Sequence, residues 1–345
     1  MLKLAIVILN WNGKAFLEKF LPSVVQHCPG YAKVFVADNG SSDGSMEFLE
    51  HSYPGIGIID LKRNFGYTGG YNRSIRQIDA EYYVLLNSDI EVTEGWIDPV
   101  IELMESAPGI AACQPKIRSY HQPGYFEYAG ASGGFIDRYG YPFCRGRIFE
   151  SLEQDHGQYD TVTDVFWATG ACMFVRAKDF VKAGMLDDEF FAHMEEIDLC
   201  WRLKRMGKRI VCVPDSIVYH VGGGTLPKNN PRKTYLNFRN NLFLLARNLP
   251  AGNFYPVLIK RLVLDQIAAA KFLLSGNAAD CIAVYKALLS VLVNLRRKRR
   301  QGKQLPYKPV GEIYQSSIVK EYFLKGRKKF TQLKKDRFVK IQPTR

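Results

Sequence analysis

Short apolar runs alternate with segments of helical spacing over the first 110 residues of the chain. The apolar runs predict strands at residues 3–9, 33–37, 56–61 and 82–86, and helical spacing predicts helices at 14–26, 45–51, 70–78 and 94–105. Strands separated by helices indicate right-handed βαβ units and a parallel sheet. Continuous runs such as LAIVIL and YYVLL are typical of strands covered on both faces. We therefore expect an α/β fold with a mostly parallel central sheet and flanking helices.

The pattern changes after residue 115. Residues 115–165 are dense in Gly, Tyr and Phe and lack helical spacing, so we expect a long excursion of short strands there. Strand character returns at 165–175 and 210–213, and residues 195–206 are predicted as a helix that Gly207 ends.

The last third of the chain is predicted to be mainly helical, with helices at 237–249, 254–274 and 281–295. The second of these is amphipathic, and its polar side carries Lys260, Arg261, Asp265 and Lys271. The apolar stretch 281–295 contains Lys286 and is shorter than the roughly 20 residues that span a bilayer. Basic residues fill 296–300, and we expect the poorly patterned residues 301–345 to be loosely ordered.

The net charge of +13 is unevenly distributed along the chain. Residues 226–345 hold 26 Lys and Arg against 5 Asp and Glu, whereas residues 1–225 hold 21 against 29. The basic part interleaves its charge with apolar runs, which favours an anionic membrane surface over nucleic acid as its partner. A solvated, partly disordered basic end is the alternative.

The cysteines and the N-terminal residues indicate in which cellular compartment the protein works. Seven cysteines stand singly, without a C-x-x-C pair, which fits reduced and mostly buried thiols. The N-terminus begins with a strand-like run and lacks the features of a signal peptide. Together these observations predict a cytoplasmic protein, peripheral on the inner face of the cell membrane.

Polar residues follow the four predicted strands, where ligands of an open α/β sheet bind. They are Asn10, Asp38, Asn39, Asn64, Gly66, Asn87, Ser88 and Asp89. Asp38 can accept a hydrogen bond from the ring N–H of uracil or thymine, although such residues also form tight turns for local reasons. The glycine-rich turn at Asn64 opens a helix whose free backbone N–H groups suit phosphate, and close packing of helix on sheet is the alternative.

Asp89 and His220 are the candidate metal ligands. Each follows a predicted strand, and carboxylate with imidazole suits Mn²⁺, while Mg²⁺ also binds oxygen ligands. Such a cation would neutralise charge that builds on a diphosphate leaving group. The glycines at 222–224 would let the backbone approach that diphosphate. An Asx turn at Asp89 and a purely structural histidine are the alternatives.

Glu195 and Glu196 begin the predicted helix 195–206. Negative charge there is favoured by the helix macrodipole, so a stabilising first turn is the simplest interpretation. One of the two glutamates could also serve as a general base for an attacking hydroxyl. Asp198 and Arg202 lie four residues apart and are expected to pair along the helix.

Seven motifs in order carry a family resemblance: NWN, ADNGSSDGS, NFGYTGGYN, LLNSDIEV, WATGACMFVR, MEEIDLCWR and VYHVGGGT. Over about residues 1–250 the chain resembles the inverting glycosyltransferases of family 2, which have the GT-A fold. It is most similar to the rhamnosyltransferase-like enzymes of surface polysaccharide assembly. The resemblance implies a GT-A catalytic domain at 1–230. The charge and helical pattern predict that a helical membrane-associating region at 231–300 and a basic tail at 301–345 follow it.

The resemblance also implies roles for individual residues. Asp38 would hold the nucleotide base, Asp89 and His220 the metal, and Glu196 would be the catalytic base. Trp167, Gly170 and Ala171 would line the pocket for donor and acceptor. Two departures from the family pattern are Asn87 in place of the first acid of the D-x-D-like motif, and Glu195-Glu196 in place of Glu-Asp.

The expected activity is transfer of a sugar from a dTDP- or UDP-linked donor to a hydroxyl of a glycan, with inversion. The donor would be dTDP-rhamnose or a UDP-sugar, the glycan acceptor would be lipid-linked, and Mg²⁺ or Mn²⁺ would assist. A sugar nucleotidyltransferase and a non-catalytic membrane-bound adaptor with the same fold are the alternatives.

Overall fold

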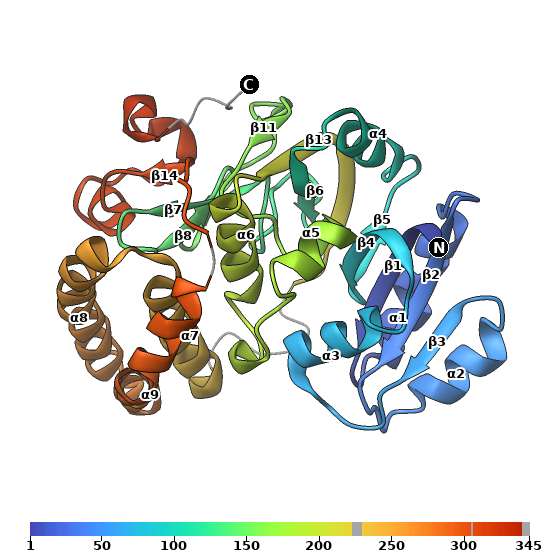
Figure 1. The fold of residues 1–345 in the computed structure, drawn as a ribbon, viewed down its shortest axis with the longest axis horizontal. Helices are drawn as coiled ribbons and strands as arrows, with labels where there is room; N and C mark the ends of the chain where they lie inside the picture. Colours follow the sequence, from blue (N-terminus) through green and yellow to red (C-terminus); the bar gives the residue numbers. More distant parts are fainter. Residues whose placement is uncertain (223–229, 305, 340–345) are drawn as a thin grey trace.

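The computed structural model describes residues 1–222, 230–304 and 306–339 (Figure 1). Its larger sheet has the strand order β11-β13-β6-β12-β4-β1-β2-β3, with β5 paired to β13. These strands are β1 (Leu2–Asn10), β2 (Ala32–Asp38), β3 (Gly57–Asp60), β4 (Ala80–Asn87), β5 (Ile90–Val92), β6 (Ile110–Ser119), β11 (Thr163–Asp164), β12 (Cys172–Arg176) and β13 (Arg209–His220). The first four are parallel to one another, as the sequence predicts, and β12 runs antiparallel between β4 and β6.

Both faces of this sheet are covered by helices. Along β1, Ala5 and Val7 join one hydrophobic core, while Leu4, Ile6 and Ile8 join the other. The helices α1 (Lys14–Gln26), α2 (Ser45–Ser52) and α4 (Asp98–Ser106) cover one face, and α3 (Gly66–Ile75), α5 (Ala177–Lys182) and α6 (Glu195–Arg205) cover the other. This double cover explains why strand β1 is apolar at nearly every position.

A second, smaller sheet forms from the excursion after β6. It has the order β10-β9-β8-β7-β14, with β7 (Gly134–Asp137), β8 (Pro142–Cys144), β9 (Arg147–Ile148), β10 (Ser151–Leu152) and β14 (Ile313–Tyr314). Strand β14 comes from the C-terminal tail, where Tyr314, Ile318 and Leu333 are buried. The expectation that residues 301–345 are loosely ordered was therefore wrong for the described part of the tail. Its apolar residues are too widely spaced to show a period, but they gather on the sheet.

Three long helices form the C-terminal extension: α7 (Pro231–Asn248), α8 (Ala251–Leu274) and α9 (Ala278–Lys303). One side of α9 is buried, including Ala283, Ala287 and Val291. Near its end, a Cβ on Gly302 would lie 1.9 Å from the carbonyl oxygen of Arg247, so only glycine allows α9 to approach α7 this closely. By length and composition α9 is sufficient to cross a bilayer, which the prediction for residues 281–295 did not anticipate.

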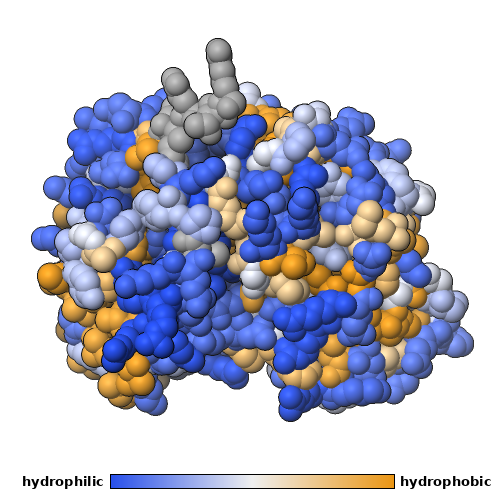
Figure 2. All heavy atoms as spheres, viewed as in Figure 1, coloured by the Kyte–Doolittle hydropathy of each residue, from blue (hydrophilic) through white to orange (hydrophobic). Residues whose placement is uncertain are grey.

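Helix α8 buries part of its polar side. Arg261 and Asp265 are buried and paired at 3.2 Å, and the hydroxyl of Tyr141 donates to Asp265 at 3.1 Å, whereas Lys260 and Lys271 are exposed. The apolar residues Ile259, Val263 and Ile267 are exposed as well. Apolar side chains gather over α8 and α9 at the lower left of Figure 2.

Candidate active site

Strand pairing brings the two candidate metal ligands together. His220 ends β13 opposite Ile90 of β5, and Asp89 occupies the turn just before β5. The Nε2 atom of His220 lies 3.1 Å from an Oδ1 of Asp89, and both side chains are buried. Their proximity is as predicted, although their role in metal binding stays a prediction. The glycines at 223 and 224, proposed to approach a diphosphate, lie outside the described residues.

A third residue, Glu127, completes this group. Its Oε2 lies 3.0 Å from Nδ1 of His220, so the imidazole is held between two carboxylates. Burial alone would lower the pKa of His220, but Asp89 and Glu127 raise the pKa to about 10. Burial would raise the pKa of Asp89, yet the charge of His220 and its hydrogen bond hold that pKa below its ordinary value. Glu127 was not predicted, because it lies in the irregular segment after β6 and belongs to no motif.

Asp89 and His220 are the side chains of this group that could contribute ligands to a divalent cation. Within the described ranges, no three His, Cys, Asp or Glu side chains are arranged to hold a metal ion by themselves. Asp89 and His220 could supply two ligands, with a diphosphate and water supplying the others, as is usual for Mg²⁺ at phosphate sites. Glu127 would then fix the imidazole with Nε2 directed to the ion.

The two glutamates at the start of α6 are enclosed by protein. Glu195 is buried and Glu196 is half-buried, and the Oε2 atom of each has no hydrogen-bond partner among the described residues. Burial raises the pKa of Glu196 to about 7. Burial, together with the adjacent charge of Glu196, raises the pKa of Glu195 well above its ordinary value. Near neutral pH, Glu196 is therefore the better proton acceptor of the two.

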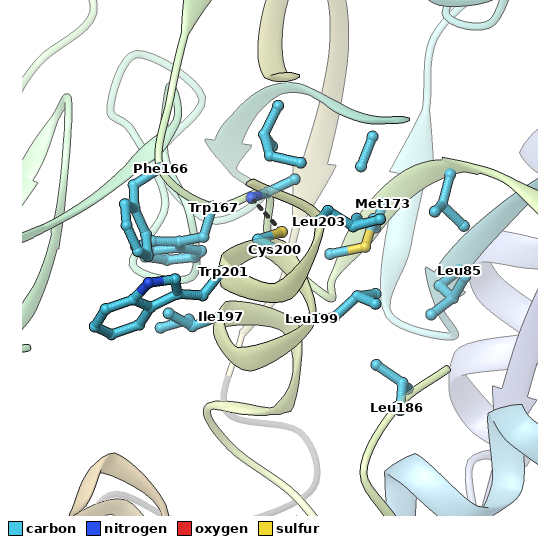
Figure 3. Close-up of a cluster of buried hydrophobic side chains, with 14 of the residues drawn as sticks. Leu85, Phe166, Trp167, Met173, Leu186, Ile197, Leu199, Cys200, Trp201 and Leu203 are labelled. Atoms are coloured by element: carbon cyan, nitrogen blue, oxygen red, sulfur yellow. Dashed lines mark hydrogen bonds between the residues drawn. The ribbon is translucent and has the colours of Figure 1, made fainter. Parts of the chain in front are cut away.

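Helix α6 is held rigidly behind these glutamates. Ile197, Leu199 and Trp201 pack into the core, and the backbone N–H of Ala168 donates to Sγ of Cys200 at 3.4 Å (Figure 3). The predicted pair of Asp198 and Arg202 is present at 2.8 Å and fully buried.

The extension helps to secure the same helix. From α7, Arg247 reaches Asp198 at 3.0 Å and the amide of Asn248 donates to Asp198 at 2.8 Å. A base on such a support keeps its position during a reaction.

Two tyrosines of α3 connect the glutamates with the Asp89 side of the site. The rings of Tyr67 and Tyr71 are 4.7 Å apart. Both phenol pKa values are raised, chiefly by burial; the negative charges of Glu195 and Glu196 add to the effect on Tyr67, and that of Asp89 adds to the effect on Tyr71. The N–H of Tyr67 donates to the carbonyl of Phe191, in the loop before the glutamates, and the hydroxyl of Tyr71 donates to the carbonyl of Leu86, three residues before Asp89. Helix α3 therefore links the two groups through hydrogen bonds, although they are far apart in the sequence.

The residues proposed for the nucleotide base are buried and tied to each other. Asp38 accepts hydrogen bonds from the Asn10 amide at 3.0 Å and from the backbone N–H of Ser41 at 2.8 Å. Asn39 donates to the carbonyl of Gly66 and accepts from the N–H of Phe65. These contacts account for a structural role in the turn, and recognition of a base by Asp38 stays a prediction. The Oδ1 atom of Asn10 is buried without a partner among the described residues.

The glycine-rich turn at Asn64 does not offer the expected free N–H groups. The N–H of Gly66 donates to Oδ1 of Asn64 at 2.7 Å, and those of Tyr67 and Thr68 donate to the carbonyl of Phe191. Gly66 has φ of 73°, and a Cβ there would lie 2.5 Å from the ring of Phe191. The expectation that these N–H groups are free was wrong, and close packing explains the glycine, while donor binding by Asn64 and Gly66 stays a prediction.

The predicted pocket residues divide into two groups. Trp167 is only 4% exposed, and its indole N–H donates to the carbonyl of Phe135, so it acts in the core rather than lining an open pocket (Figure 3). Gly170 and Ala171 lie closer to the site. The hydroxyl of Tyr67 donates to the carbonyl of Gly170 at 2.6 Å, and the N–H of Asn87 donates to the carbonyl of Ala171 at 2.9 Å.

Asn87 and Ser88 are partly exposed where β4 ends, directly before Asp89. The chain therefore carries an amide, not a carboxylate, two residues before Asp89 at the edge of the site.

Comparison with known proteins identifies the domain that carries this geometry. Residues 5–175 match glycosyl transferase family 2. The chain belongs to this family. It is similar over 235 residues, at 28% identity, to an N-acetylglucosaminyl-diphospho-decaprenol L-rhamnosyltransferase of Mycobacterium tuberculosis. The match covers 63% of this chain and 75% of that protein. The rhamnosyltransferase WbbL of Escherichia coli is 26% identical over 61% of this chain and 80% of its own length.

The fold of this family 2 protein agrees with solved structures. The crystal structure of GalNAc-T7 with UDP, GalNAc and Mn²⁺ superposes with a TM-score of 0.56, at 16% identity, over 72% of this chain and 48% of that one. At this identity the likeness shows the fold alone. The expectation of a rhamnosyltransferase-like family 2 protein with the GT-A architecture is confirmed.

Proposed function

We propose that this family 2 glycosyltransferase moves a hexose, with rhamnose as the first candidate, from a dTDP- or UDP-linked donor to a hydroxyl of a lipid-linked glycan. The observation that carries the proposal is the Oε2 atom of Glu196, which is buried without a hydrogen-bond partner among the described residues, at the start of a helix packed into the core. The neighbouring helix α3 leads to the end of β4 before Asp89, where the hydroxyl of Tyr71 donates to the carbonyl of Leu86. The similarity to two rhamnosyltransferases supports the choice of sugar.

The reaction needs one base. Glu196 takes the proton of the acceptor hydroxyl, the acceptor oxygen forms a bond to the anomeric carbon, and the bond from that carbon to the diphosphate oxygen breaks. Because no protein nucleophile takes part, the single displacement inverts the configuration at the anomeric carbon. The pKa of about 7 allows Glu196 to be ionised at neutral pH and still accept a proton readily.

The diphosphate is the leaving group, and Asp89 with His220 would hold the Mg²⁺ or Mn²⁺ that accompanies it. When bound, such a cation supplies positive charge that stabilises the departing diphosphate. The Mn²⁺ in the GalNAc-T7 structure, which has the same fold, is consistent with this assignment. Glu127 keeps the His220 ring in place, and Asp38 remains the candidate for recognising the nucleotide base.

The outer faces of α8 and α9 are proposed to meet the cytoplasmic face of the membrane. On α9, the exposed apolar residues Leu289, Leu292 and Val293 lie next to the basic cluster at 296–300. Apolar side chains beside cations are what an anionic bilayer surface attracts. This placement would bring the enzyme to acceptors that are anchored in lipid.

The decisive test compares Glu196→Gln with Glu195→Gln, using dTDP-rhamnose or UDP-sugars, a lipid-linked acceptor and Mn²⁺. We expect Glu196→Gln to lower the rate of transfer by at least 100-fold while donor affinity, measured by calorimetry, is retained. Full activity in Glu196→Gln with loss in Glu195→Gln would move the base to Glu195. Full activity in both variants would remove the proposed mechanism.

A further inference from the structure

The loop before the catalytic helix has an unusual backbone. Phe191, His193 and Met194 all have positive φ, at 64°, 69° and 70°, and none of them is glycine. Residues other than glycine rarely adopt a positive φ unless the surrounding structure enforces it. The loop leads directly into Glu195 and Glu196, so whatever enforces its path also sets the position of the base.

One side chain of α7 gathers the carbonyl groups of this loop. The amide of Asn240 donates to the carbonyl oxygens of Phe190 at 2.9 Å, Ala192 at 2.9 Å and His193 at 2.8 Å. Asn240 is fully buried. Its own oxygen accepts from Nε of Arg239 at 2.8 Å, which fixes the amide with its nitrogen toward the loop.

Further contacts hold the loop from both sides. Arg239 also donates to the carbonyls of Glu189 and Phe190, at 2.9 and 3.1 Å. On the opposite side, the carbonyl of Phe191 accepts from the N–H of Tyr67, whose ring lies beside the glutamates. The loop is therefore clamped between α3 and α7, and on the α7 side Asn240 is the residue that bonds the carbonyls of Ala192 and His193, directly before Met194.

We propose that Asn240 is a positioning residue for catalysis, which holds the loop of positive-φ residues so that Glu196 faces the acceptor hydroxyl. This inference rests on the proposed function of Glu196. Asn240 belongs to the C-terminal extension and contacts neither glutamate in the described structure, so it acts through the loop. Without the amide, the three carbonyls lose a shared donor, and the loop is free to relax toward ordinary backbone angles.

The test uses the full-length protein with Asn240→Ala and Asn240→Asp. Aspartate keeps the shape of asparagine but has no N–H to donate when ionised. We expect kcat to fall at least tenfold in both variants, with the dissociation constant of the nucleotide-sugar donor changed less than threefold. The half-maximal pH of the kcat profile should move from about 7 toward the ordinary glutamate range of about 4.3, because water reaches Glu196. Asn237→Ala, one turn earlier on α7 and only partly buried, is the matched control and should behave as the parent.

Two results would overturn the proposal: unchanged kcat and pH profile in folded Asn240 variants, or a loss of donor affinity as large as the loss of kcat. If neither Asn240 variant folds, Arg239→Ala removes hydrogen bonds to the same loop from a partly exposed side chain and should show a smaller change of the same kind. Unchanged kcat and pH profile in Arg239→Ala would then overturn it. Failure of the proposed function is recognised separately, because Glu196→Gln would then be fully active.

Discussion

The exposed apolar stripe of α8 gives a quantitative prediction about membrane binding. Ile259, Val263 and Ile267 are 63%, 56% and 62% exposed, and one variant replaces all three with Asn. Full burial of such a side chain contributes about 1.5–3 kcal/mol, so immersing the exposed part of each contributes about 1–2 kcal/mol. The three together contribute about 3–6 kcal/mol, which corresponds to a loss of about 100- to 20,000-fold in the partition coefficient.

Co-sedimentation with phosphatidylglycerol vesicles measures this loss. The matched control replaces Val25, Val162 and Val181, which are exposed on the body of the molecule, and should keep its binding within threefold of the parent. Thermal unfolding of both variants checks that they are folded. If the α8 variant binds within threefold of the parent, the stripe does not enter the membrane and the reasoning fails.

Three other predictions concern the site and its support. Below about pH 7 the kcat/KM of the parent should fall tenfold per pH unit, because Glu196 must be ionised to accept a proton; a flat profile between pH 5 and 7 argues against it. Asp89→Ala and His220→Ala should each weaken Mn²⁺ binding in the presence of donor nucleotide by at least tenfold, as read by electron paramagnetic resonance, and parent-like spectra would contradict the assignment. Asp198→Ala should lower the free energy of unfolding by about 3–5 kcal/mol in urea, since it leaves buried Arg202 unpaired; a loss under 1 kcal/mol would show that the pair is not structural.

The sequence predicted most of the larger sheet because its strands are covered on both faces and therefore appear as unbroken apolar runs. It also predicted that Asp89 and His220 meet, since both follow strands of one sheet. Glu127 and Asn240 could not be found in this way. Each acts through a contact over a long sequence distance, and neither stands at a strand end or within a recognisable motif.

The polarity of α8 shows a second limit of sequence patterns. Periodicity separates the two sides of a helix, but it does not say which side is inside. Arg261 and Asp265 neutralise each other and meet Tyr141 within the protein, so these two polar residues are buried while Lys260 and Lys271 stay exposed. Ile259, Val263 and Ile267 lie together on the outside, and a contiguous exposed apolar surface of this kind is typical of an interaction site.

The ion pairs between α9 and the segment before α6 limit how this enzyme can be shortened. Lys298 is fully buried and binds Asp187 at 2.7 Å and Glu189 at 2.9 Å. Deletion of the residues after Pro250 would remove the cation that pairs with Asp187 and Glu189. It would also expose to solvent the side of α7 that packs against α9. Variants for crystallisation or assay are therefore better sought by exchanging surface side chains than by removing the residues after Pro250, because α9 and the segment that leads into α6 share one interior.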